Sequence, residues 1–226
     1  LLNLVSQAEQ QAPVDDAVRA LRQRHVDLAQ ALLRADRATA FIADFDRELA
    51  DIVSILNAVR ITRSASTVIR DLVSGFGEIW STRVFTQLLA VRGRRPGAVS
   101  WVDARDWVRV DWSALGPAVR WDESRANAAA RVPTAPAATL VITGFIARTA
   151  DGLQTTLGRN GSDFSASIMG DLLDASEIVI WTDVDGVLSA DPRRVPEATV
   201  IDSLSYHEAM ELAYFGAKVK IGRAHV

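Results

Sequence analysis

The stretch "TLVITGFIARTADGLQTTLGRNGSDFSASIMGDLLDASEIVIW", Thr139 to Trp181, decides the fold class because strand and helix signals alternate along it. A β-favouring run, Thr139–Ala147, comes first, and Asp151-Gly152 then predicts a short hairpin that returns through "LQTTL". Apolar residues recur every four positions from Phe164 to Leu172, which indicates a helix. The continuous apolar run Glu177–Trp181 is typical of a buried parallel strand. This order predicts an α/β sandwich with a largely parallel sheet.

Helical signals dominate the sequence before this stretch. From Leu1 to about Arg70, apolar residues recur at helical spacing with almost no glycine or proline, which predicts a set of packed helices. Their apolar faces would suit a core or a protein partner equally well. The glycine-rich segment Ser74–Gly77 predicts a turn that opens a helix ending at Gly93. Near the end of the chain, "SYHE" forms an S-x-x-E capping box that predicts another helix start.

Composition excludes several classes of protein. The 226 residues are 49% hydrophobic and carry a net charge of -3 without a basic stripe, which argues against nucleic-acid binding. No apolar run approaches the roughly 20 residues of a membrane span, and no signal peptide is recognisable, so a cytoplasmic protein without a membrane partner is expected. The absence of cysteine excludes disulfides and thiolate chemistry. The three histidines are far apart, so any metal would be a hard cation held by oxygen.

The segment "TTLGRNGSDFSAS" has two alternative interpretations on local grounds. Gly158 and Gly161 permit positive φ and close approach of a ligand, and Ser162 can cap a helix that starts near Asp163. Exposed N–H groups at that helix start would attract phosphate, and Arg159 would add a bidentate cation. A plain helix cap is the commoner meaning of such a segment. It is not a P-loop, because no Gly-Lys-Ser/Thr follows.

A second candidate is the acidic loop "WTDVDGVLSADPRR", which follows the apolar run at the edge where open α/β sheets bind ligands. Asp183, Asp185 and Asp191 could hold Mg²⁺ directly or through water, and Arg193 could neutralise a nucleotide phosphate. A surface turn with aspartates in capping roles explains the same residues.

Three further features are ambiguous or negative by themselves. Glu78, at an expected helix start, and Lys218, just past an expected helix end, suit either the helix dipole or a ligand. "SGFGEIWS" is not a dinucleotide fingerprint, because Trp80 occupies the third glycine position.

Taken in order, "TGFIA…TTLGRNGSD", "WTDVDGVLSADPR" and "SYHEAMELAYFGAKV" resemble aspartate kinase of the amino acid kinase family. The form with "LGRNGSD" and "WTDVDGV" is most similar to the kinase portion of bifunctional aspartate kinase/homoserine dehydrogenase. The diagnostic motifs cover Ser74–Ser81 and Thr143–Val219. The resemblance implies a three-layer α/β/α sandwich that lacks its first strand and loop.

The resemblance also implies an activity. The γ-phosphoryl group of MgATP would be transferred to the side-chain carboxylate of L-aspartate, giving 4-phospho-L-aspartate for the synthesis of lysine, threonine and methionine. L-Aspartate, ATP and Mg²⁺ are the implied ligands, with no metal ligand assigned to the protein. The complete protein would be a homo-oligomer and could carry a homoserine dehydrogenase half. Because two anions must meet, the protein would chiefly position them and supply cations and N–H groups.

The family motifs assign roles to individual residues. Glu78 would hold the substrate ammonium, Arg159 its α-carboxylate, and Phe145 would line the pocket. The residues implied at the reacting groups are Gly161, Ser162 and Asp163. The residues implied in nucleotide binding are Thr182, Asp183, Arg193 and Lys218.

Some residues depart from the family pattern. Leu188 replaces a tyrosine that would contact nucleotide, and the "K-F-G-G-T" strand and loop with its catalytic lysine is missing. The chain ends in "KIGRAHV" where the family continues "LHP". We therefore expect a partial catalytic domain over 1–219, mainly helical over 1–73 and substrate- and nucleotide-binding over 74–219, with a non-native tail over 220–226. Such a chain is expected to be inactive alone.

Two other functions stay open. A kinase for glutamate or N-acetylglutamate is the alternative within the family, although the pattern at Glu78 and Arg159 argues against it. A non-catalytic regulatory or oligomerisation module, with the helical first part as its interface, is the alternative from another class.

Overall fold

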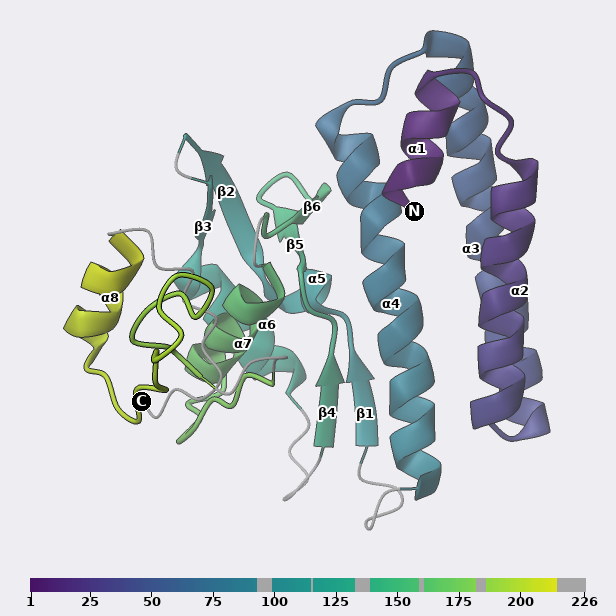
Figure 1. Ribbon diagram of the computed structural model, residues 1–226. Coiled ribbons are helices and arrows are strands. Elements are labelled where there is room, and N and C mark those ends of the chain that lie inside the picture. Colours follow the sequence, from purple (N-terminus) through teal and green to yellow (C-terminus); the bar gives the residue numbers. More distant parts are fainter. Residues whose placement is uncertain (93–98, 115, 133–138, 159–160, 182–185, 215–226) are drawn as a thin grey trace. The chain divides into compact units, whose positions relative to one another are not determined.

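A computed structural model describes residues 1–92, 99–114, 116–132, 139–158, 161–181 and 186–214 (Figure 1). The chain forms two compact units, Leu1–Ser165 and Ala166–Val226, and each is described by itself. No described helix is long and apolar enough to cross a membrane.

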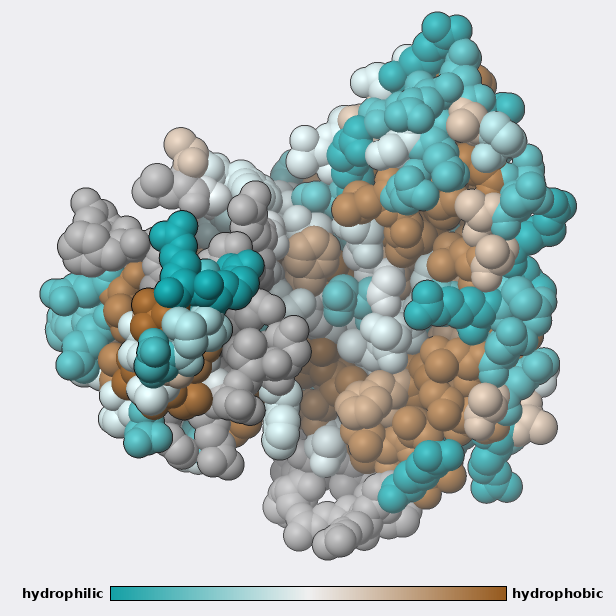
Figure 2. Space-filling view, in the orientation of Figure 1, coloured by the Kyte–Doolittle hydropathy of each residue, from teal (hydrophilic) through white to brown (hydrophobic). Residues whose placement is uncertain are grey.

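Four helices make up the first part of the larger unit, as the apolar spacing predicts. They are α1 (Leu2–Glu9), α2 (Asp15–Leu32), α3 (Ala35–Thr62) and α4 (Thr67–Arg92). Helices α1 and α2 pack against α3, and α4 packs against α1 and α3 (Figure 1). Figure 2 shows that the outer side of α2 is hydrophilic, while hydrophobic residues gather between α2 and α4. The apolar stripes therefore face inward and form one core.

Helix α4 separates this helical core from the strands. On the core side, Trp80 is buried, its ring lies 4.5 Å from that of Phe45, and its Nε1 donates to Glu48 at 2.7 Å. The same Glu48 carboxylate accepts a bond from Arg83. On its other side α4 contacts β1, β4 and β6 (Figure 1). The helix is thus held from both sides.

The described strands form two small sheets. Strand β1 (Val99–Val102) pairs in parallel with β4 (Thr139–Ile142). The other sheet has the order β3-β2-β5-β6, with parallel pairing between β2 and β5 and antiparallel pairing on both sides of them. Its strands are β2 (Arg109–Ser113), β3 (Gly116–Val119), β5 (Ile146–Thr149) and β6 (Gln154–Thr156). The other helices of the described residues are α5 (Ala104–Trp107), α6 (Trp121–Arg131), α7 (Gly161–Leu172) and α8 (Tyr206–Tyr214).

The α/β class is confirmed, but the sheets of the described residues are small and mixed rather than largely parallel. The reason is that short hairpins join neighbouring strands, and a short hairpin can only connect antiparallel strands. The predicted hairpin at Asp151-Gly152 is confirmed, since Ile146 pairs with Thr156 and Gly152 has φ +85°.

The predicted single strand Thr139–Ala147 is two strands, β4 and β5, in different sheets. Phe145 lies between them with φ +66°, a left-handed conformation that interrupts an extended chain. The β-favouring pattern therefore indicates the strand content correctly, whereas the corner at Phe145 depends on its tertiary contacts.

The predicted turn at Ser74–Gly77 is wrong, because these residues lie inside α4. Gly75 is buried and brings the helix backbone close to Ile146 and Gln154. Glu78 is consequently in the middle of a helix and not at its start. The predicted end at Gly93 lies outside the described residues.

The predicted buried strand Glu177–Trp181 is also wrong. Among these residues only Ile178 takes part in a β-bridge, and the Trp181 side chain is 91% exposed. An apolar run forms a strand only if partner strands satisfy its backbone. In the described part of the smaller unit, the other bridge is the isolated one between Leu188 and Val200.

Both predicted helix starts near the motifs can be compared with the structure. The capping box is confirmed: Ser205 N donates to Glu208 Oε2 at 2.7 Å, and Glu208 N donates to Ser205 Oγ at 3.3 Å. Helix α7, however, begins at Gly161, so Ser162 lies in its first turn and is not its N-cap. The helix begins two residues earlier than the pattern suggests, at a glycine that fits closely against Phe145.

Candidate active site

The carboxyl ends of the parallel pair β1–β4 form one edge of the candidate site. Thr143 N donates to Val102 O at 3.1 Å, and Thr143 Oγ1 accepts a bond from Ala104 N at 2.8 Å. Thr143 is buried, and its two bonds join the ends of β1 and β4 at the points where the chain leaves the sheet. Ligands of open α/β sheets bind at this kind of edge.

The corner at Phe145 connects this edge to α7. Phe145 N donates to Ser165 Oγ at 2.8 Å, and Phe145 O accepts from Leu157 N at 2.7 Å. Ser165 Oγ in turn donates to Gly161 O at 2.7 Å. These bonds hold a non-glycine residue in the left-handed region, which is unfavourable by about 1 kcal/mol or more.

The start of α7 lies directly against this corner. A Cβ built on Gly161 would lie 2.7 Å from Phe145 Cδ2 and 3.2 Å from Leu157 Cβ. A Cβ built on Gly144 would lie 3.8 Å from both Cα and Oγ of Ser162. The structure therefore brings together three of the predicted site residues: Phe145, Gly161 and Ser162. Asp163 follows in the first turn of α7, where its side chain is exposed.

Glu78 lies on the side of α4 that faces the strands. Residues three and four apart share a helix face, and Glu78 lies between Gly75 and Thr82 on that face. Gly75 approaches Ile146, and Thr82 Oγ1 accepts a bond from Trp101 Nε1 at 2.9 Å. Trp101 is the ladder partner of Val141 in β4.

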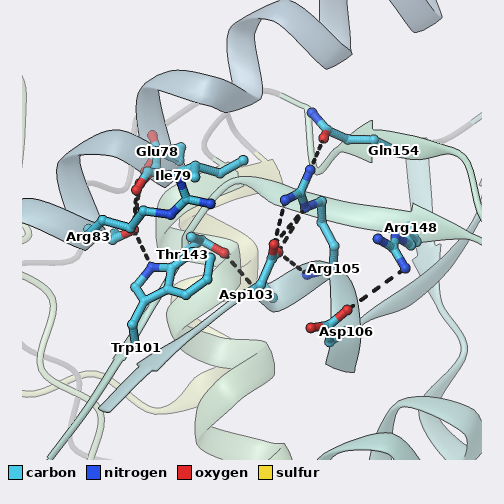
Figure 3. A network of polar contacts seen from close by, with 12 residues as sticks. Glu78, Ile79, Arg83, Trp101, Asp103, Arg105, Asp106, Thr143, Arg148 and Gln154 are labelled. Carbon is cyan, nitrogen blue, oxygen red and sulfur yellow. Dashed lines mark hydrogen bonds and ion pairs between the residues drawn. The ribbon is translucent and has the colours of Figure 1, made fainter. Parts of the chain in front are cut away.

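Glu78 is consequently level with the segment of chain between Val141 and Ile146. This segment contains the end of β4 and the Phe145 corner. Figure 3 shows Glu78 on its helix with Thr143 and Trp101 beside it in the view. The two sides of the candidate site, α4 and the start of α7, thus adjoin the same corner.

The electrostatic state of Glu78 sets it apart. Its side chain is half-buried, and its carboxylate makes no hydrogen bond or ion pair with any residue of the described chain. Burial raises the pKa of this carboxyl above its ordinary value. Such a carboxylate can accept the ammonium group of a ligand.

The sequence pattern missed a set of polar residues that joins α4 to the hairpin β5–β6. Figure 3 shows part of it, from Asp103 through Arg105 to Gln154. Gln154 Nε2 donates to backbone carbonyls of α4, and the Asp71 carboxylate accepts bonds from Thr155 and Thr156. The threonine pair directly before "LGRNGSD" was the available signal, but its partner is more than 80 residues away in the chain.

Of the four nucleotide candidates, the described residues include Arg193 alone. Arg159, Thr182, Asp183 and Lys218 lie outside the described residues. Arg193, in the smaller unit, is exposed and forms an ion pair with Asp191 at 3.0 Å. Hydrogen bonds from Arg193 lower the pKa of the Asp191 carboxyl. Within the described residues, no group of three or more histidine, aspartate or glutamate side chains is arranged to hold a metal ion.

Comparisons with known proteins agree with the motifs. The chain is 37% identical over 224 residues to bifunctional aspartokinase/homoserine dehydrogenase 1, chloroplastic, of Zea mays, covering 97% of this chain and 24% of that protein. It is 37% identical over 199 residues to bifunctional aspartokinase/homoserine dehydrogenase 2 of Escherichia coli, covering 88% of this chain and 24% of that protein. The chain thus spans about a quarter of the length of these relatives.

A solved structure is similar as well. Escherichia coli aspartokinase III in complex with aspartate and ADP matches with a TM-score of 0.81 and 28% identity, over 96% of this chain and 48% of that one. The family model described as "Amino acid kinase family" matches residues 12–225 of this chain. By the fold, the motif order and these matches, the chain belongs to the amino acid kinase family.

Proposed function

We propose that this chain carries part of the catalytic domain of an aspartate kinase. The enzyme would transfer the γ-phosphoryl group of MgATP to the side-chain carboxylate of L-aspartate, forming 4-phospho-L-aspartate for lysine, threonine and methionine synthesis. The observation that carries the proposal is the half-buried carboxylate of Glu78, which has no partner among the described residues. The solved complex of aspartokinase III with aspartate and ADP supports it.

A half-buried charge without a partner is unfavourable, and a ligand that brings an ammonium group removes this penalty. On the other side of the Phe145 corner, the first N–H groups of α7 carry the positive end of the helix dipole. They attract negative charge. A small amino acid with an extra carboxylate suits this arrangement, its ammonium toward Glu78 and its anionic groups toward α7.

The chemistry needs orientation more than covalent assistance. A side-chain carboxylate oxygen of aspartate attacks the γ-phosphorus, the bond from that phosphorus to the β,γ-bridging oxygen breaks, and ADP leaves with the electron pair. We assign Gly161, Ser162 and Asp163 to the surroundings of the reacting groups. Arg159 would hold the α-carboxylate, and Phe145 would line the pocket.

The nucleotide would be bound by Thr182, Asp183, Arg193 and Lys218. Arg193 fits this role if a phosphate replaces Asp191 as its partner, since both are anionic acceptors for a guanidinium. The Mg²⁺ ion would arrive with the nucleotide phosphates, with no protein side chain assigned to it.

Further properties of the complete protein remain proposals. Its catalytic domain would be a three-layer sandwich with a largely parallel sheet, of which residues 1–219 form part. The names of the bifunctional relatives suggest a homoserine dehydrogenase half, which homoserine-dependent reduction of NAD(P)⁺ would test. The family also suggests a homo-oligomer, and a cytoplasmic location is part of the proposal.

The test is ADP formation by the complete polypeptide with L-aspartate, L-glutamate or N-acetyl-L-glutamate as acceptor. Hydroxylamine in a parallel assay traps an acyl phosphate as its hydroxamate. We expect turnover and hydroxamate with L-aspartate alone, and no turnover from the 226-residue chain by itself. Turnover with glutamate or its N-acetyl derivative instead would identify another amino acid kinase, and no turnover with any acid would favour a non-catalytic module.

A further inference from the structure

Two polar clamps join helix α4 to the hairpin β5–β6. In the first clamp, the Asp71 carboxylate accepts bonds from Thr155 Oγ1 at 2.9 Å, Thr156 N at 3.2 Å and Thr156 Oγ1 at 3.3 Å. Both threonines are buried, and Thr155 Oγ1 also accepts a bond from Trp112 Nε1 at 2.7 Å. Hydrogen bonds to a charged acceptor are stronger than neutral ones, so the end of β6 is held firmly to α4.

The second clamp is the side-chain amide of Gln154 (Figure 3). Its Nε2 donates to Asp71 O and Leu72 O, both at 3.1 Å, and its Oε1 accepts from Arg105 Nη1 at 2.5 Å. Arg105 is itself held by Asp103, whose two carboxylate oxygens accept from Arg105 Nε at 2.9 and 3.0 Å. A guanidinium can only donate, so Arg105 fixes the amide with its oxygen outward and its nitrogen toward α4.

The clamps adjoin both sides of the candidate active site. Glu78 follows Asp71 by seven residues, about two turns, on the same unbroken helix, so the two side chains share one face. On the hairpin side, α7 begins five residues after Thr156. The clamps therefore tie the helix that carries Glu78 to the hairpin that leads into α7.

We propose that Asp71 and Gln154 are positioning residues for phosphoryl transfer, which set the separation between Glu78 and the start of α7. Arg105 orients Gln154 for this task. The proposal rests on the proposed function, because it requires one substrate to span both sides. A displacement of about 1 Å in a substrate-positioning group can lower a rate about 100-fold. Neither residue is assigned to the substrate itself, and each acts through the backbone that carries the site residues.

The experiment measures kcat, KM for L-aspartate, KM for ATP and Tm for variants of the complete polypeptide. Gln154→Glu keeps an acceptor for Arg105 but loses both N–H donors toward α4, whereas Gln154→Ala loses both contacts. We expect KM for L-aspartate to rise about tenfold or more in both variants, with KM for ATP unchanged within about twofold. Asp71→Asn keeps one acceptor oxygen, so it should raise KM for L-aspartate less than Asp71→Ala does.

Glu9→Gln is the matched control. Glu9 is a carboxylate that also joins distant segments: it accepts from Ala65 N at 2.9 Å and Arg70 Nη2 at 2.5 Å, next to the first turn of α4. Neither of these two bonds involves the hairpin β5–β6 or a residue of either clamp. Its Tm should fall as in the clamp variants, while KM for L-aspartate stays at the parent value.

The outcomes separate the two proposals. If the parent protein gives no aspartate-dependent turnover, the proposed function fails and the positioning role fails with it. If the parent is active but KM for L-aspartate is unchanged in both Gln154 variants, only the positioning role is overturned. The same holds if KM for L-aspartate and KM for ATP rise together in proportion to the loss of Tm, which would indicate a purely structural effect. If Asp71→Ala does not fold, KM for L-aspartate in Gln154→Glu and Asp71→Asn decides whether the positioning role holds.

Discussion

The side-chain amide of Gln154 occupies the space that a side chain at position 75 would need. A Cβ built on Gly75 would lie 2.3 Å from Gln154 Nε2 and 2.9 Å from Ile146 Cγ2. Helix α4 and the hairpin can therefore approach this closely only because position 75 carries no side chain.

Gly75→Ala should consequently destabilise the protein although alanine is the better helix former. The added methyl group must displace Gln154 from the carbonyls of Asp71 and Leu72, and such overpacking is unfavourable by about 1–3 kcal/mol. Gly77→Ala in the same helix is the control, since its Cβ would meet only Leu1 Cδ1 at 3.6 Å. There we expect a gain of up to about 1 kcal/mol. Thermal unfolding that shifts in the same direction for both variants would contradict the close approach at Gly75.

Glu78→Gln should raise stability at neutral pH while it lowers activity. Because burial raises the pKa of Glu78, the folded state binds its proton more tightly than the unfolded state does. Between the two pKa values the free energy of unfolding of the parent therefore falls as pH rises. In Glu78→Gln the free energy of unfolding does not fall in this way, because glutamine does not ionise. The Tm of the variant should therefore exceed that of the parent by more at pH 7 than at pH 4. Its kcat/KM for L-aspartate should fall at least about 30-fold, since losing one partner of a partly buried charge pair is unfavourable by about 2 kcal/mol or more.

Glu48→Gln is the contrasting variant, because Glu48 has partners where Glu78 has none among the described residues. Its carboxylate accepts bonds from Trp80 Nε1 and Arg83 Nη1, both at 2.7 Å. Removing its charge should lower Tm at neutral pH. Equal Tm shifts in Glu78→Gln and Glu48→Gln would show that Glu78 is not held as an unpartnered charge.

Gly161→Ala should disturb the site through the Phe145 ring. Its Cβ would lie 2.7 Å from Phe145 Cδ2, so the ring or the start of α7 must move, and we expect kcat/KM to fall about 100-fold. Gly144→Ala tests the sterics, because its nearest contacts, to Ser162 and Ser165, are ordinary ones at 3.8 Å. Its Tm should fall less than that of Gly161→Ala. Steady-state kinetics and unfolding curves of the pair give both quantities, and a parent-like Gly161→Ala enzyme would refute the tight fit.

Arg193→Ala should change nucleotide affinity and leave stability nearly unchanged. The ion pair with Asp191 is exposed, and exposed pairs contribute about 0–1 kcal/mol. If Arg193 binds a phosphate of ATP, KM for ATP should rise about tenfold or more, because a charge-assisted bond to phosphate is lost. Arg194→Ala, next to it in the chain, serves as the control. A rise in KM of the same size in both variants would indicate a general charge effect instead of a specific contact.

How much of this fold could be predicted depends on how far apart the deciding residues are. The hairpin at Asp151-Gly152 and the capping box from Ser205 to Glu208 are confirmed, because each depends on residues within a few positions of one another. The turn at Ser74–Gly77 is wrong for the opposite reason. Gly75 is needed for contact with a strand about 80 residues later, which no local pattern contains.

The candidate site divides in the same way. Family motifs point to Phe145, Gly161 and Ser162, and the structure brings these together. The unpartnered state of Glu78 within the described chain could not be predicted, because it depends on which neighbours fold around it. The contacts of Asp71 could not be predicted for a related reason. The sequence around a helical aspartate is the same whether the side chain is solvated or, as here, accepts bonds from two threonines far along the chain.

Helix α4 has a consequence for how this sequence can change during evolution. Glu78 and the clamp residue Asp71 must lie on the same face of this 26-residue helix. Each residue inserted into a helix rotates all later residues about the helix axis by about 100°. A single insertion or deletion between Asp71 and Glu78 would swing the carboxylate from the strands toward the helical core, although every individual contact residue would survive. We therefore expect relatives to vary freely in the length of their loops but to keep the spacing of these two residues invariant.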